Sequence, residues 1–167
     1  MLEFGSENKE IIENVKGAPF VLSIEDNGDN CLKIVIALPK KGKQGEGAEE
    51  LLVKDNEKLN ELIMNSYPVY EDMDNIFEIV FENYIIYQCR NESYTTYDDR
   101  EIRKGNYLII FEKSQLLNYY KDVIFDCDFD NEKQNRKHYG IYTENHIIDV
   151  ISNDQPVISK IKYSYNK

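Results

Sequence analysis

The sequence contains no tryptophan, and its 167 residues include only two histidines and three cysteines. Cys31, Cys89 and Cys127 are odd in number and widely spaced, and they form no Cys-x-x-Cys pair, so neither a disulfide framework nor a cysteine zinc cluster is indicated. We expect buried, reduced thiols. His138 and His146 would need at least one further ligand to form a zinc site. No Gly-x-Ser-x-Gly motif is present, so a hydrolase triad has no support.

Long apolar stretches are also lacking. No uninterrupted apolar run is longer than that of Ile34–Leu38, far short of the roughly 18 to 20 residues that cross a bilayer. The N-terminus shows no basic region followed by an apolar segment, which is the mark of a secretory signal. The opening Leu2–Ser6 resembles linker sequence and carries little weight. We therefore expect a cytoplasmic protein that does not enter a membrane.

Positive charge is scarce. Lysine and arginine number 20 against 31 aspartates and glutamates, which gives a net charge of −11 and a pI near 4.7. A nucleic-acid binder needs a basic surface to neutralise phosphates, and anionic lipid also repels an acidic protein. The charge instead favours a basic partner. Apolar residues make up 41% of the chain, enough to build a core, so intrinsic disorder is not expected.

The length predicts a single domain over residues 1–167. In its first part we expect a helix over Glu7–Lys16, then a hairpin made by Phe20–Glu25 and Cys31–Leu38. A flexible, basic Gly/Lys loop follows over 39–47. The spacing of leucines predicts a long amphipathic helix over Ala48–Ser66.

The second part is dominated by strand patterns. Apolar residues alternate from residue 76 to residue 90, and Asn83 marks either a turn or a bend, which leaves open whether this is one strand or two. Asn91–Gly105 is polar and predicts a loop. A strand is expected over Tyr107–Glu112, followed by a helix that Ser114 caps and that carries Leu116, Leu117 and Tyr120. Three short strands are expected after it: Tyr139–Tyr142, Ile147–Ile151 and Val157–Tyr163. This order predicts an α+β fold with a mainly antiparallel sheet and about three helices.

The string Asp126, Asp128 and Asp130 has the alternating carboxylates that open a calcium loop. That loop requires glycine at its sixth position and glutamate at its twelfth, where this sequence has Asn131 and Lys137. The string also resembles the Asp-x-Asp motif of aspartate-nucleophile phosphatases. Those enzymes need a long parallel α/β domain after this motif, and too few residues follow it here. A solvated acidic loop is the favoured interpretation. A small metal-dependent hydrolase using these three aspartates, with either histidine as a further ligand, is the alternative.

Tyrosine is abundant, with 13 in the chain, and most of these residues lie in its second half. Tyrosine combines a large apolar face with a hydrogen-bonding hydroxyl, so it is enriched at protein interfaces. In a chain without tryptophan it can equally fill half-buried positions in a sheet, and both interpretations stay open. Acidic clusters lie near these tyrosines. Together they favour a surface complementary to a basic protein.

Four segments, Tyr84–Tyr94, Gly105–Tyr120, His138–Tyr142 and His146–Ser152, resemble small immunity proteins of bacterial polymorphic-toxin systems. The resemblance covers roughly residues 76–160. It implies a non-enzymatic protein that binds a cognate toxin domain, often a basic nuclease, and blocks its active site or substrate path. It implies no cofactor. An acidic binding or scaffold protein is a further alternative.

If the resemblance holds, the toxin contacts lie in the polar loop between two apolar strands, where recognition residues are commonly displayed. For Glu92 and Tyr94 the alternative role is to fasten this loop by hydrogen bonds. The candidate partner-binding residues are Glu92, Tyr94, Tyr97, Asp98, Asp99 and Glu101.

Overall fold

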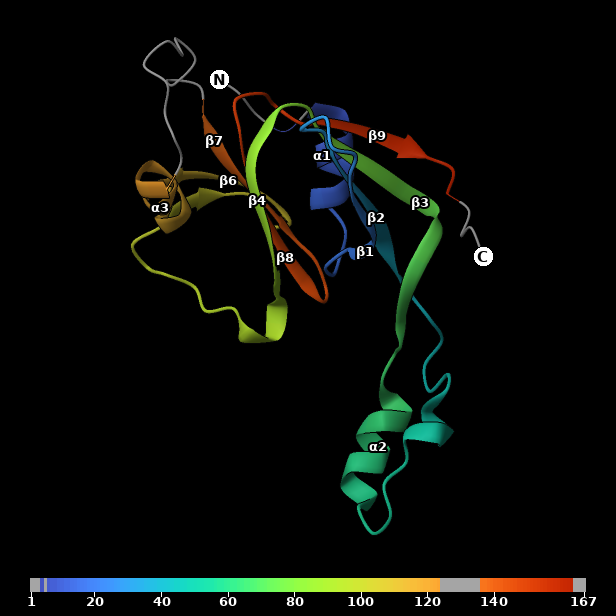
Figure 1. Cartoon of the computed structure of the whole chain (residues 1–167). Coiled ribbons are helices and arrows are strands. Elements are labelled where there is room, and N and C mark those ends of the chain that lie inside the picture. Colours follow the sequence, from blue (N-terminus) through green and yellow to red (C-terminus); the bar gives the residue numbers. More distant parts are fainter. Residues whose placement is uncertain (1–3, 5, 124–135, 164–167) are drawn as a thin grey trace, which may run out of the picture.

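Two antiparallel sheets form the frame of the molecule in the computed structural model, which describes Phe4 and residues 6–123 and 136–163 (Figure 1). Three α-helices accompany the sheets in this part of the chain. The predicted α+β fold with mainly antiparallel pairing is therefore confirmed. No helix within the described residues is both long and apolar enough to traverse a bilayer.

The first sheet has the strand order β1-β2-β3-β9. Its strands are β1 (Phe20–Asp26), β2 (Leu32–Lys41), β3 (Val69–Phe81) and β9 (Val157–Ile161). The predicted hairpin of the first two strands is present, and Gly28 and Asn30 in its turn both adopt positive φ. Such conformations suit glycine and asparagine, which explains why the chain reverses there.

The second sheet has the order β4-β8-β7-β6-β5. Its strands are β4 (Tyr84–Asn91), β8 (His146–Ser152), β7 (Lys137–Tyr142), β6 (Leu108–Lys113) and β5 (Ile102–Lys104). The helix α3 (Gln115–Val123) follows β6, and the hydroxyl of Ser114 accepts a hydrogen bond from the Leu117 N–H as an N-cap does.

The open question about residues 76–90 has a clear answer. A tight turn at Asn83, with φ of 58°, separates β3 from β4, and the two strands belong to different sheets. The long alternating pattern therefore spans the passage from one sheet to the other.

The core lies where the two sheets face each other. Alternate apolar side chains of β2 and β3 meet those of β6, β7 and β8 there. Helix α1 (Ser6–Glu13) adds Ile12, and the ring of Phe4 meets that of fully buried Tyr139 edge-on at 5.0 Å between centroids. Burial raises the pKa of Tyr139 to about 12. The opening segment, treated as linker in the sequence analysis, thus contributes a core residue.

Further predictions require correction. The segment Asn91–Gly105 is not loop throughout, because it contains the short strand β5. The helix expected over 48–66 is interrupted, and it consists of the short 3-10 helix η1 (Ala48–Leu51) and helix α2 (Glu57–Asn65). Between them Asp55 adopts a φ of 61°, and the Asn56 side chain accepts a hydrogen bond from the Leu59 N–H and begins the second helix. The loop expected over 39–47 starts later, because β2 continues to Lys41.

Cys31 is half-buried and Cys89 is exposed, so the expected burial of these two free thiols is wrong. Cys31 lies in the β1–β2 turn, just before β2, and Cys89 lies on β4, which is an edge strand of the second sheet. Cys127 lies outside the described residues.

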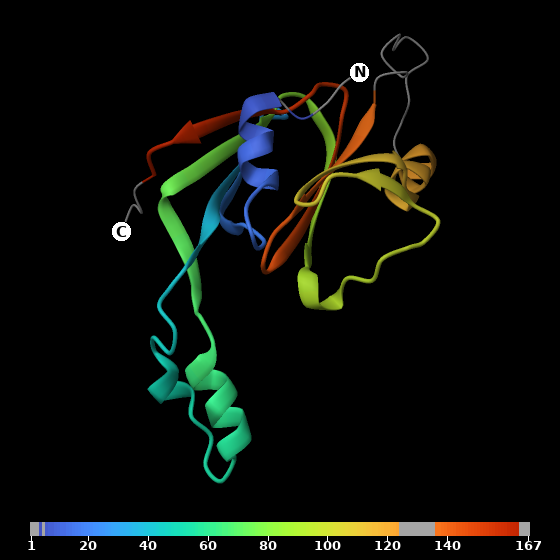
Figure 2. The same cartoon turned by 180° about the vertical axis from the view of Figure 1, so that it is seen from behind.

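Residues 39–73 form a projecting arm (Figures 1 and 2). It comprises the ends of β2 and β3 together with η1 and α2, and the two strand ends pair from Pro39 opposite Glu71 to Lys41 opposite Val69. Strand β1 pairs with β2 only as far as Ala37, so Pro39 occupies a free strand edge, where a missing N–H is tolerated. Helix α2 contains no buried residue.

Candidate functional site

A cavity of about 370 Å3 lies on the second sheet, between the strands, the loop that follows β4, and helix α3. Strand alternation brings its floor together: Gln88 and Arg90 are two residues apart on β4, and Gln88 pairs in register with Asp149 of β8. Gly140 of β7 lies opposite Asp149 on the other side. Because Gly140 has no side chain, the rings of Phe111 and Tyr142 close over it.

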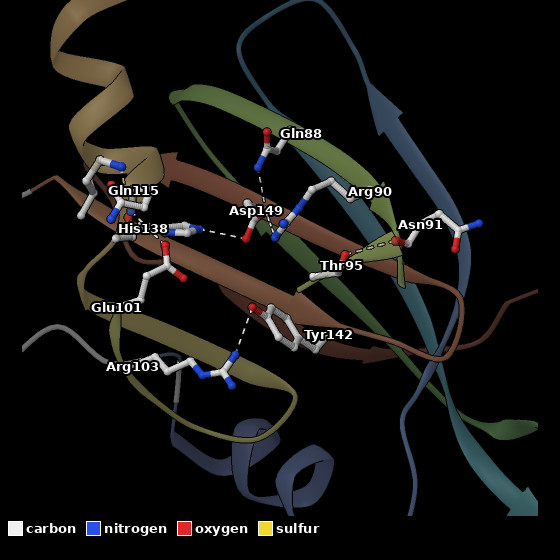
Figure 3. Close-up of polar contacts among 12 residues, drawn as sticks. Gln88, Arg90, Asn91, Thr95, Glu101, Arg103, Gln115, His138, Tyr142 and Asp149 are labelled. Carbon is white, nitrogen blue, oxygen red and sulfur yellow. Dashed lines mark hydrogen bonds and ion pairs between the residues drawn. The ribbon is translucent and has the colours of Figure 1, made fainter. Parts of the chain in front are cut away.

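The floor of the cavity centres on the carboxylate of Asp149 (Figure 3). His138 Nε2 lies 3.0 Å from Oδ1, while Gln88 Nε2 and an Arg90 guanidinium nitrogen each donate to Oδ2 at 2.9 Å. Asp149 is 1% exposed and His138 2% exposed. Burial alone would raise the pKa of Asp149, but the hydrogen bonds from His138 and Gln88 and the nearby positive charge of Arg90 lower it overall.

The imidazole of His138 is held on a second side by the ring of Phe111. The two rings are stacked, with centroids 3.9 Å apart and planes inclined by 4°. The stacked ring and the carboxylate together fix the orientation of His138 and exclude water from it. The arrangement gives a buried, ordered polar floor whose carboxylate oxygens already have donors.

The walls of the cavity are aromatic and acidic. Tyr97 stacks on Tyr142 with centroids 6.3 Å apart, and the guanidinium of Arg103 lies 4.3 Å from the Tyr97 ring centroid. Tyr119 of α3 and the carboxylates of Asp98 and Glu101 also line the cavity. Arg103 donates to the hydroxyl of Tyr142 at 3.3 Å, as Figure 3 shows.

Four of the six predicted contact residues are exposed. They include Tyr94, which is 89% exposed and follows Glu92 in the 3-10 helix η2 (Glu92–Tyr94), and Tyr97, which is 61% exposed; Asp99 is the fourth. The Glu92 N–H donates to the carbonyl of Asn145, so its backbone fastens the loop.

The other two predicted residues, Asp98 and Glu101, are half-buried and are used within the loop. Asp98 forms an ion pair with Arg100 at 2.6 Å, and the hydrogen bonds from that arginine lower the pKa of Asp98 to about 2. Glu101 accepts a hydrogen bond from the Gln115 N–H at 2.9 Å, at the start of α3. A carboxylate at a helix N-terminus is favourably placed because the unpaired N–H groups there carry partial positive charge.

The residues of the alternative metal site are not brought together in the described part of the chain. Asp126, Asp128 and Asp130 lie outside the described residues. His138 and His146 lie near the starts of the two antiparallel strands β7 and β8, and they therefore lie toward opposite ends of that hairpin. In the ranges 6–123 and 136–163 no group of three or more histidine, cysteine, aspartate or glutamate residues could hold a metal ion.

No sequence motif predicts the polar floor made by Gln88, Arg90 and Asp149, or the place of His138 beside it. A signal was present, because Asp149 interrupts the apolar run of β8. A carboxylate inside such a strand is buried, and a buried carboxylate requires positively charged or hydrogen-bonding partners.

Comparisons of the chain with protein-family models, with curated proteins and with solved structures found no match.

Proposed function

We propose that this chain is a non-enzymatic immunity protein that binds a basic protein toxin and occludes its functional surface. The observation that carries the proposal is the display of large aromatic and apolar side chains on two projecting elements, which the described part of the chain leaves uncovered. One element is the loop 92–101 and the other is the arm.

The loop supplies the tyrosines. Tyr94 and Tyr97 expose most of their surface beside the exposed carboxylates of Glu92 and Asp99. Exposed tyrosine is a common anchor at protein interfaces, since its ring buries a large area and its hydroxyl pairs with polar groups. In an inhibitor of a nuclease, rings and carboxylates of this kind occupy the positions of substrate base and phosphate.

The arm supplies apolar area. Leu51 is 65% exposed and Leu62 is 63% exposed, and clusters of exposed apolar side chains mark interaction surfaces. In both views η2, at the start of the loop 92–101, lies at the end of the body toward which the arm extends (Figures 1 and 2). The further exposed members of this arm surface are Leu52, Val53, Leu59, Met64, Tyr67, Val69, Tyr70 and Met73.

The net charge of −11 supports a basic partner. Electrostatic complementarity accelerates association and selects against other acidic proteins. The association rate with the toxin should therefore fall as ionic strength rises. A rate that does not depend on salt would contradict this electrostatic part of the proposal.

The test is to co-express the tagged chain with the products of its neighbouring genes and to measure the affinity of any complex that survives a high-salt wash. The key variant is Asp99→Lys in the loop, and the matched control is Asp29→Lys, an equal charge change in the β1–β2 turn. That turn adjoins the start of β4, where the Tyr84 N–H donates to Asn30, whereas the loop follows its end.

The expected result is a complex with a basic, toxic chain whose affinity drops at least about tenfold in Asp99→Lys and much less in Asp29→Lys. Equal losses in both variants would show that only net charge matters. Failure to retain any basic chain would overturn the proposal.

A further inference from the structure

We infer that the cavity beside loop 92–101 binds an arginine side chain. The inference rests on the proposed function for the source of that side chain, which is the basic partner. The choice of arginine as the ligand follows from the charges and aromatic rings of the cavity, and arginine binding can be tested without the partner.

Within the described residues, one of the carboxylates that line the cavity has no cation paired with it. Three carboxylates line the cavity, but His138, Gln88 and Arg90 occupy the oxygens of Asp149. Asp98 is likewise neutralised by Arg100. In the described part of the chain, Glu101 has only the Gln115 N–H as a partner and no cation within ion-pair distance. One oxygen of the half-buried Glu101 carboxylate therefore stays free for a donor.

Tyrosine rings form one wall of the cavity. A cation is attracted to the face of an aromatic ring, and arginine is favoured because its planar guanidinium also stacks. Tyr97 and Tyr142 already hold one guanidinium, that of Arg103, at 4.3 and 5.5 Å from their ring centroids. Tyr119 lines the same cavity and is exposed at its edge. A guanidinium that enters the cavity can lie beside Tyr119 and donate to Glu101.

The size of the cavity also fits a single side chain. At about 370 Å3 the cavity is near the lower end of the roughly 300 to 1,000 Å3 range of ligand pockets. The carboxylate oxygens of Asp149 on its floor already have donors, so the free carboxylate oxygen lies on the wall, at Glu101. This arrangement suits the end of one long side chain.

The experiment is a titration of the isotope-labelled full chain, followed by amide NMR shifts, with acetyl-Gly-Arg-Gly-amide. The comparison peptide carries citrulline in place of arginine, which keeps the shape but removes the charge. The test variant is Glu101→Gln, whose amide oxygen can still accept from the Gln115 N–H. Asp29→Asn, an equal charge change in the exposed β1–β2 turn, is the control.

The arginine peptide should give saturable shifts at residues 97–101 and 115–119, with a millimolar dissociation constant typical of one side chain. Affinity should fall about tenfold or more for citrulline and for Glu101→Gln, and it should be unchanged in Asp29→Asn. Absence of saturation up to about 50 mM, equal binding of citrulline, or unchanged binding by Glu101→Gln would each overturn the inference.

The two proposals fail separately. Loss of arginine selectivity with a toxin complex still formed would remove only the cavity from the account. If the cavity selects arginine but no basic partner is found, the assignment of the cavity stands and the proposal of a toxin partner is overturned.

Discussion

Asp149 is the residue whose environment most strongly shapes the candidate site. Its carboxylate is 1% exposed in the middle of an apolar strand and accepts from three side chains. Removing the charge of a buried, paired carboxylate leaves its former partners without a counter-ion, which typically costs about 3 to 5 kcal/mol. The contribution of Arg90 is smaller because its side chain is 40% exposed and solvent screens it.

Asp149→Asn should therefore lower the free energy of unfolding by about 2 to 4 kcal/mol at neutral pH, measured by urea denaturation. The pKa of Asp149 is below the ordinary value of 3.8, so its stabilising effect is present above that value and is lost as the pH falls through the lowered pKa. The difference between wild type and variant should shrink below pH 3.8. A difference that persists undiminished to the lowest pH at which the chain folds would contradict the assignment, as would an equal loss in the exposed control Asp29→Asn.

Gly105 is a second residue with a specific structural requirement. Its φ is +107°, and a Cβ there would lie 2.2 Å from the carbonyl oxygen of Leu108. Gly28 also has a positive φ, of +81°, but has open space around it. Gly105→Ala should thus cost more than about 2 kcal/mol of unfolding free energy, and Gly28→Ala about 1 kcal/mol. Equal costs in chemical denaturation would mean that the close approach to Leu108 is relieved without penalty.

At the scale of elements, alternation predicted the strands well because each strand has one face against the core. The leucines of residues 48–66 follow a helical spacing, but that pattern assumes a core for the helix to cover. The arm offers none, so local preferences decide, and Asp55 and Asn56 form a turn and a helix cap instead. The pairing of β4 with β8, which builds the floor of the site, joins residues about 60 apart, and no local pattern specifies it.

Helix α1 is joined to the second sheet by Glu13. Its carboxylate accepts from three successive N–H groups, those of Asn106 at 2.8 Å, Tyr107 at 3.2 Å and Leu108 at 2.7 Å. Hydrogen bonds to a charged acceptor contribute about 1.5 to 3 kcal/mol. The carboxylate thus holds the turn before β6 against the helix, close to Gly105.

Glu13→Ala should destabilise the chain by about 2 kcal/mol, and Glu13→Gln by less because one acceptor remains. The control is Glu10→Ala, one turn earlier on the same helix, whose side chain is exposed. Urea denaturation of the three variants provides the comparison. If Glu10→Ala were as destabilising as Glu13→Ala, the effect would belong to helix propensity and the attachment to β6 would be unsupported.

At the scale of the whole molecule, the arm and the two-sheet body differ in how much apolar surface each one buries. The body has the core between its sheets, whereas α2 buries no side chain. An element that adds little to stability and exposes apolar surface is more simply explained by contact with a partner. Composition predicted the acidic character of this molecule, but only the structure shows where the apolar surface projects.

Replacing residues 42–68 by Asn-Gly should remove the arm and leave the body folded. Lys41 and Val69 are partners in the β2–β3 pairing, so a two-residue turn closes the hairpin there. We expect the thermal midpoint, followed by circular dichroism, to change by no more than about 4 °C, as for a change near 1 kcal/mol. A fall several times larger would show that the arm supports the core.

The most direct test of the central claim is a protection measurement. Cells express the basic product of a neighbouring gene together with one of three forms of this chain, and their growth is recorded. The three forms are the wild type, the double variant Tyr94→Ala/Asp99→Lys, and the control Asp29→Lys. The account requires that wild type and control restore growth and that the double loop variant does not. If no neighbouring product is toxic, or if the loop variant protects as fully as wild type, the account is contradicted.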